Sequence, residues 1–187
     1  MRMDATAPLT AYDVVNTWSY EELRRILFEY GEERYAPLIA AAIERERADK
    51  PIQTTLELVR VIKGAMPAKA LREKQHPAKR SFQAIRIAVN DELGAVREAM
   101  EKAIDCLNPG GRLAVITFHS LEDRRVKQFF DLRSRPEIDR PEWPAPRPNP
   151  DYCFRPLSRK PVTAGEEELS TNPRSRSAKL RGVEKII

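Results

Sequence analysis

Leu107-Asn-Pro-Gly-Gly-Arg-Leu-Ala-Val-Ile-Thr-Phe-His-Ser-Leu-Glu-Asp-Arg124 is the stretch from which the fold of this chain is best predicted. Its Pro-Gly-Gly turn ends the element before it. The run Leu113–Phe118 that follows is almost continuously apolar and rich in β-branched and aromatic residues. Such a run predicts a β-strand covered on both faces, as in the sheet of an α/β protein.

Polar side chains begin where this strand is expected to end. His119, Ser120, Glu122 and Asp123 follow it directly, and residues 126–130 then show the apolar spacing of a helix. Because open α/β sheets bind ligands at the carboxyl ends of their strands, these four residues are candidates for lining a catalytic crevice. Structural roles are the alternative, since Ser120 and Asp123 have the spacing of a helix cap and acids favour a helix N-terminus.

The composition describes one core of ordinary size or two small ones. The chain has 187 residues, 41% hydrophobic and 33% charged, and its longest apolar run, 36–43, is too short to cross a bilayer. Without an apolar signal core at its start, the chain is predicted to be cytoplasmic. The two distant cysteines, Cys106 and Cys153, are expected to be reduced thiols. No metal site is predicted, because they have no ligand partners at short spacing.

A basic block lies between Arg60 and Asn90, where eight lysines and arginines face a single acid. The net charge of the chain is +5, so the remainder is slightly acidic. Such a block suits a phosphate backbone, and Lys79, Arg80 and Arg86 are the candidate phosphate contacts. An equally good interpretation is a solvated helical face whose counter-charges lie on another element.

Three short amphipathic helices are predicted before this block. Capping boxes at Ser19-x-x-Glu22 and Thr54-x-x-Glu57 start the first and third. The second carries an apolar stripe of Tyr35, Leu38, Ile39, Ala42 and Ile43. Residues 1–17 show no clear period. Three helices joined by short loops predict a small bundle rather than a βαβ unit.

Helical spacing resumes at Phe82 and extends to Leu107, either as one helix or as two with a break at Asn90. Six prolines predict an extended loop over 133–150, and alternation over 178–186 predicts a strand with one solvated face. So few strands cannot cover both faces of 113–118. No glycine-rich nucleotide loop follows a strand. The pattern is that of the second half of an α/β domain.

Three long motifs closely resemble the MraW/RsmH family of bacterial methyltransferases. They are 76–93 (His-Pro-Ala-Lys-Arg-Ser-Phe-Gln-Ala-Ile-Arg-Ile-Ala-Val-Asn-Asp-Glu-Leu), 107–124, and 172–181 (Asn-Pro-Arg-Ser-Arg-Ser-Ala-Lys-Leu-Arg). The resemblance extends over essentially the whole chain. It implies transfer of a methyl group from S-adenosylmethionine to the exocyclic N4 of one cytidine in 16S ribosomal RNA of the small ribosomal subunit.

The resemblance also implies a domain organisation. The family has a class I, Rossmann-like methyltransferase sheet with a helical domain inserted in it. Residues 1–89 resemble that inserted domain, and 90–187 resemble the last helices and strands of the sheet. The family's glycine-rich cofactor loop and ribose-binding acid have no counterpart, so no cofactor-binding residue can be assigned. An N-terminally truncated chain, inactive without its missing half, is therefore expected.

Partners follow from the same resemblance. The basic residues expected to contact ribosomal RNA are Lys79, Arg80, Arg86, Arg124, Arg174 and Arg176. The alternatives are that Arg124 pairs with the neighbouring acids and that Arg174 and Arg176 lie in a solvated loop. The missing N-terminal half is a second expected partner, and an exposed sheet edge would favour a homodimer. The alternative function is a non-catalytic RNA-binding or interaction module built on the helical domain.

Overall fold

The computed structural model describes residues 1–187, which divide into two compact units, Met1–Glu92 and Leu93–Ile187. The predicted boundary, between residues 89 and 90, lies close to this division. The identity of the first unit as an inserted domain remains a prediction. None of the helices is both long enough and apolar enough to span a membrane.

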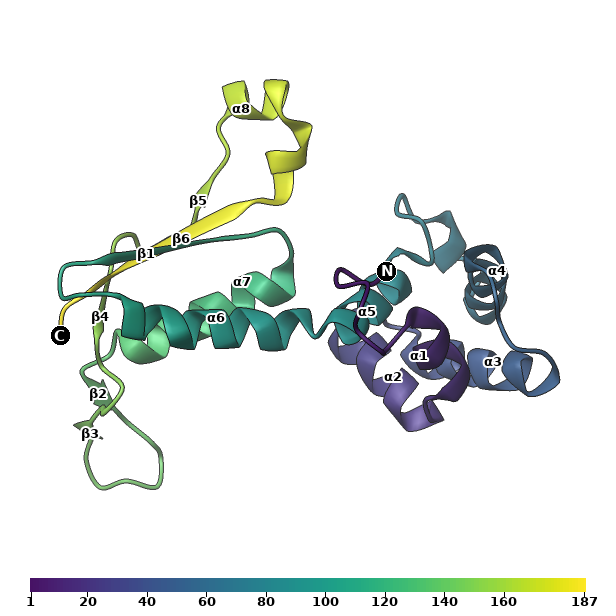
Figure 1. The fold of residues 1–187 in the computed structure, drawn as a ribbon, viewed down its shortest axis with the longest axis horizontal. Coiled ribbons are helices and arrows are strands. Elements are labelled where there is room, and N and C mark those ends of the chain that lie inside the picture. Colours follow the sequence, from purple (N-terminus) through teal and green to yellow (C-terminus); the bar gives the residue numbers. More distant parts are fainter. The chain divides into compact units, whose positions relative to one another are not determined.

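The first unit is entirely helical (Figure 1). Its elements are α1 (Ala11–Thr17), α2 (Tyr20–Glu29), α3 (Ala36–Asp49), α4 (Thr55–Ala65), the 3-10 turn η1 (Ala70–Arg72) and α5 (Lys79–Asn90). Both predicted capping boxes are present, at Ser19 and Thr54. Helix α1 was not predicted. Its signal is a third capping box, in which Thr10 and Asp13 satisfy each other's backbone donors.

The apolar stripes of these helices form one core. Its fully buried side chains include Leu23, Ile26, Leu27, Ile39, Ile43, Ile62 and Ile85. The expectation that Leu38 faces inward is wrong, because its side chain is 53% exposed. The buried stripe of α3 is formed by Ala36, Ile39, Ala40 and Ile43 instead. Leu38 lies beside that stripe rather than in it.

Gly31 allows α2 and α5 to meet backbone to backbone. A Cβ atom at this position would lie 2.6 Å from the Leu27 carbonyl oxygen and 2.9 Å from the Arg80 carbonyl oxygen. Gly31→Ala is therefore expected to destabilise the chain by about 1–3 kcal/mol, as overpacking does, in a urea titration followed by circular dichroism. Gly64→Ala is the control, since a Cβ there meets nothing within 4 Å. Equal stability of the two variants would contradict the prediction.

The helical region 79–106 consists of two helices, α5 and α6 (Glu92–Cys106). The alternative with a break near Asn90 is therefore confirmed. Asp91 adopts a left-handed conformation with φ of 44°, which ends α5. The Asn90 side chain donates to the Arg86 carbonyl oxygen at 2.8 Å and accepts from the Met3 N–H at 2.7 Å. The break is thus held within the first unit.

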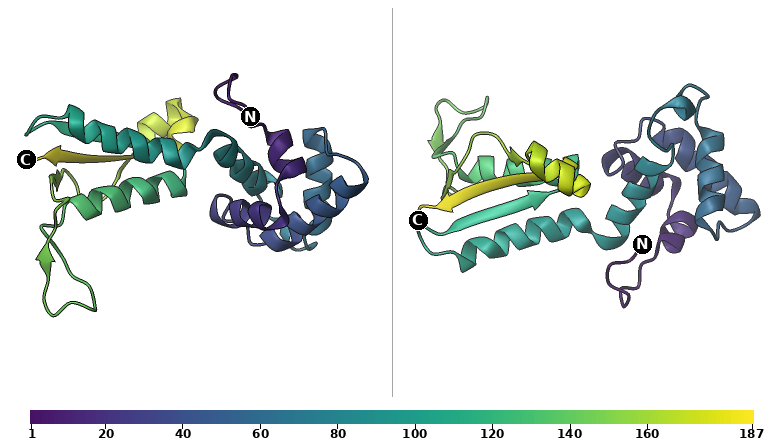
Figure 2. Two further views of the ribbon diagram at one scale, coloured as in Figure 1. Left: turned by 60° about the horizontal axis from the view of Figure 1, so that its bottom comes forward. Right: turned by 90° about the horizontal axis from the view of Figure 1, so that it is seen from above.

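The second unit combines helices with a small antiparallel sheet (Figures 1 and 2). After α6 its elements are β1 (Arg112–Thr117), α7 (Ser120–Arg133), β2 (Glu137–Ile138), β3 (Arg147–Pro148), β4 (Phe154–Pro156), β5 (Val162–Thr163), α8 (Glu166–Thr171), the 3-10 helix η2 (Pro173–Ser177) and β6 (Lys179–Lys185). Strand β6 is central and pairs antiparallel with β1, β4 and β5. The helix-rich α/β class is confirmed.

The prediction that strand 113–118 is covered on both faces is wrong for the described chain. Leu113 and Val115 pack into the core formed with α6 and α7. On the opposite face Ile116 is 58% exposed, and Phe118, just beyond β1, is 56% exposed. The reason is that α6 and α7 lie on the same side of the sheet (Figure 1). Strand β1 is also an edge strand, because β6 is its only pairing partner.

The predicted proline-rich loop is a protruding arm, residues 136–148, closed at its base by Asn149. The Asn149 side chain donates to the carbonyl oxygens of Leu132 at 2.7 Å and Arg135 at 2.8 Å. Its backbone N–H donates to the Pro136 carbonyl oxygen at 2.8 Å. Asn149 is buried, so these bonds tie the two ends of the arm together.

Candidate functional site

The carboxyl end of β1 leads into α7 through a capping box centred on His119. His119 has extended backbone angles, and its Nδ1 accepts from the Glu122 backbone N–H at 3.3 Å. In return, Glu122 Oε2 accepts from the N–H groups of Phe118 at 2.9 Å and His119 at 3.3 Å. The cap predicted from Ser120 and Asp123 is therefore wrong. The chain enters the helix one residue earlier, and Ser120 is an exposed residue of its first turn.

The same two side chains form a second contact. His119 Nε2 lies 3.2 Å from Glu122 Oε1. This is within ion-pair distance, so a protonated His119 would place its positive charge beside the Glu122 carboxylate. Burial raises the pKa of Glu122, but hydrogen bonds from His119 and the Phe118 N–H oppose it, so the pKa lies below its ordinary value. Glu122 is thus an ionised carboxylate fixed at the start of α7.

Asp123 faces the inner side of the sheet and joins α7 to β6. Its Oδ1 accepts from Arg181 Nε at 2.7 Å, and its Oδ2 accepts from Arg181 Nη2 at 3.2 Å and Lys179 Nζ at 3.1 Å. The hydrogen bond from Arg181 holds the Asp123 pKa below its ordinary value, although burial opposes the shift. These partners lie 56 and 58 residues along the chain. The sequence signal was the alternation of Lys179 and Arg181 on one face of a strand.

Acid is expected to weaken the second unit through these two carboxyl groups. Each has a folded-state pKa below its unfolded value, so each stabilises the fold above about pH 4 and loses that contribution as the pH falls further. Urea unfolding at pH 7, 5, 4 and 3 should show a smaller loss in Glu122→Gln than in the parent chain. Identical pH dependences would contradict the expected role of Glu122.

The basic residues predicted to bind RNA fall in both units. In the first unit Lys79 is exposed, whereas Arg86 is held by Glu92, with Nε–Oε1 and Nη2–Oε2 distances of 2.7 and 2.9 Å. At Arg86, therefore, the basic block has its counter-charge on another element of the protein, as the alternative interpretation of the block expected. In the second unit Arg124, on the first turn of α7, and Arg174 and Arg176, in η2, are exposed.

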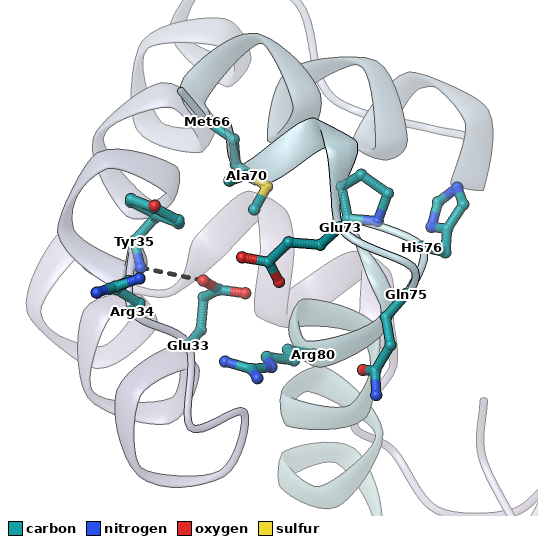
Figure 3. Close-up of a pocket in the computed structure, with 10 residues that line it drawn as sticks. Glu33, Arg34, Tyr35, Met66, Ala70, Glu73, Gln75, His76 and Arg80 are labelled. Carbon is teal, nitrogen blue, oxygen red and sulfur yellow. Dashed lines mark hydrogen bonds between the residues drawn. The ribbon is translucent and has the colours of Figure 1, made fainter. Parts of the chain in front are cut away.

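Arg80 lines a pocket of the first unit that was not predicted (Figure 3). The pocket has a volume of about 220 Å³ and lies between the α2–α3 loop, the end of α4, η1 and the start of α5. Its polar walls include Glu33, Tyr35, Glu73 and His76. Glu33 is only 2% exposed. Residues 33–35 and 66–80 come together only in the tertiary fold, so no local motif revealed the pocket.

A family profile and three curated proteins that match this chain all belong to one group of methyltransferases. The profile of the MraW methylase family matches residues 1–186. Three curated proteins named "Ribosomal RNA small subunit methyltransferase H" match all of this chain, from Exiguobacterium sibiricum (57% identical), Symbiobacterium thermophilum (55%) and Limosilactobacillus fermentum (53%). The chain covers 60%, 58% and 59% of these relatives. It therefore spans less than two thirds of their length.

Proposed function

Because the chain belongs to the MraW methylase family, we propose that it is part of an S-adenosylmethionine-dependent enzyme that methylates the exocyclic N4 of a cytidine in 16S ribosomal RNA. The observation that carries the proposal is the family match over 1–186, together with the names of relatives above 50% identity. The proposed partner is the RNA of the small ribosomal subunit.

We propose that the described residues are only part of the site for the methyl donor. At the turn from β1 to α7, the N–H groups of Phe118 and His119 already donate to Glu122. The Gly110–Gly111 turn precedes β1 instead of following it. We propose that the part of the relatives that this chain does not match binds the cofactor. The exposed Ile116 and Phe118 and the unpaired edge of β1 support packing of that part against the outer face of the sheet.

Both units are assigned residues that contact the RNA. Methylation of an exocyclic amine depends on aiming its lone pair at the methyl carbon, and the base must leave the stack to reach it. We assign Lys79, Arg80, Arg124, Arg174 and Arg176 to contacts with the RNA, while the Glu92 contact makes Arg86 a weaker candidate.

The four residues predicted to line the crevice divide into two pairs. His119 and Ser120 are assigned to the crevice wall. Glu122 and Asp123 are assigned positioning roles, because their oxygens are occupied by the contacts that fix α7 and their pKa values are lowered. A strongly hydrogen-bonded, ionised carboxylate is a poor proton acceptor.

A non-catalytic RNA-binding or interaction module is the second candidate function. The observation that favours it is that the Phe118 and His119 N–H groups, at the turn after β1, already donate to Glu122. In that case the chain would bind the small subunit without binding the methyl donor.

A chimera separates the two functions. In the chimera, this chain replaces the matching region of the Exiguobacterium relative, and the rest of that relative is kept. The complete relative is the positive control. With unmethylated small subunits and radiolabelled S-adenosylmethionine, the chimera is expected to yield N4-methylcytidine by mass spectrometry, and the chain alone to yield none. Methyl transfer to another atom would refute the N4 assignment. Binding without transfer by the chimera would favour the second function, and calorimetric binding of the cofactor by the chain alone would refute the proposed division.

A further inference from the structure

We propose that the pocket of the first unit binds a guanine base of single-stranded RNA, with Glu33 and Arg80 contacting two edges of that base. The inference rests on the proposed function, since it takes RNA as the ligand. It adds a base-specific subsite built entirely from the first unit (Figure 3).

The first observation is a buried carboxylate that can accept more hydrogen bonds than the protein donates to it. Glu33 is 2% exposed, and its Oε1 accepts from the Tyr35 N–H at 3.0 Å. The carboxylate is turned into the pocket (Figure 3), and no basic group forms an ion pair with it within 4.0 Å. A buried charge is costly unless it is hydrogen-bonded or paired. A ligand with hydrogen-bond donors would add to the one hydrogen bond that the Tyr35 N–H supplies.

The second observation is a guanidinium facing the same space. Arg80 Nη1 donates to the Glu32 carbonyl oxygen at 3.1 Å, which anchors the side chain at the pocket. The guanidinium has five N–H donors, so others remain for a ligand. Because Arg80 and Glu33 do not form an ion pair, the pocket presents an acceptor and a donor group separately.

Guanine matches this arrangement better than the other bases. A carboxylate only accepts hydrogen bonds, and guanine alone presents two adjacent donors, N1–H and the N2 amino group. Cytosine and adenine place an acceptor nitrogen beside their amino group. Arginine binds the O6 and N7 acceptors of guanine, which lie on the neighbouring edge. A cavity of about 150 Å³ holds a benzene ring, so about 220 Å³ is sufficient for one heterocyclic base.

The test measures binding of the full 187-residue chain to fluorescein-labelled hexauridylate with one central substitution. Guanosine is expected to bind about 10-fold more tightly than uridine, adenosine or cytidine, the discrimination typical of a bidentate contact. Inosine lacks the N2 amino group and should lose most of this preference. Glu33→Gln should lose it as well, whereas Glu44→Gln, which removes an equal charge from an exposed position of α3, should keep it.

Replacement of the buried Glu33 carboxylate can impair folding. In that case the inosine comparison tests the contact between Glu33 and the N2 amino group on the unaltered protein. Equal affinity for all the oligonucleotides would overturn the guanine subsite and leave the proposed methylation intact. A preference that persists with inosine, or in a folded Glu33→Gln variant, would also overturn it. Failure to bind any oligonucleotide would exclude the subsite, and the chimera experiment would decide separately whether the methyltransferase assignment stands.

Discussion

Asp123→Ala is expected to destabilise the second unit by about 3–5 kcal/mol, which is the loss typical of removing one partner from a buried ion pair. Asp123 is 8% exposed and accepts three hydrogen bonds from Arg181 and Lys179. Without it, the largely buried Arg181 guanidinium keeps its charge and loses its acceptor. The attachment of α7 to β6 would weaken at the same time.

Hydrogen exchange of the β6 amides gives a measurement confined to the second unit, since the two units need not unfold together. Asp105→Ala removes an exposed acid from α6 and should change the exchange free energy by no more than about 0.5 kcal/mol. Adding Arg181→Met to Asp123→Ala should recover part of the loss, because the uncompensated charge is removed. A loss below about 1 kcal/mol for Asp123→Ala would mean that the contact is unimportant for stability.

Phe154→Ala is expected to have an effect of similar size, about 3–5 kcal/mol. Phe154 is fully buried and meets the ring of Phe130 edge to face, with a centroid distance of 5.9 Å. It also packs with Val126 and Val183, so its removal opens a cavity where α7 and the sheet meet. Such a cavity loses both transfer free energy and dispersion contacts.

Phe118→Ala is the matched control for this substitution, because it removes the same side chain from a position that is 56% exposed. It should change the stability of the chain by about 0.5 kcal/mol or less. Urea unfolding followed by circular dichroism, together with exchange at β6, tests both variants. Comparable losses from the two would contradict the assignment of Phe154 to the core and of Phe118 to the surface.

Local signals in the sequence were sufficient for most helices. A capping box depends on residues three positions apart, so Ser19 and Thr54 marked α2 and α4 correctly. Helix α1 was missed because its seven residues are too short for a clear apolar period, although Thr10 and Asp13 carry the same box. The break after Asn90 was left open because the residue that ends α5, Asp91, carries no glycine signal for its left-handed conformation.

Features that depend on distant residues were harder to predict. The apolar run 113–118 correctly indicated a strand, but its composition could not show that α6 and α7 cover only one face. Asp123 was placed at a helix N-terminus, yet its partners come from β6, far along the chain. Glu33 had no motif at all, since its pocket forms only when residues 66–80 fold against the α2–α3 loop.

The closure of the arm by Asn149 makes this region a suitable place for protein engineering. Because the Asn149 contacts fix both ends of 136–148 to the end of α7, the contents of the arm can change without altering the path of the chain on either side. Doubling the length of a flexible loop costs only about 0.6 kcal/mol. An affinity tag inserted between Pro144 and Pro146 should therefore be tolerated, and it would allow the protein to be captured under mild conditions together with whatever it binds.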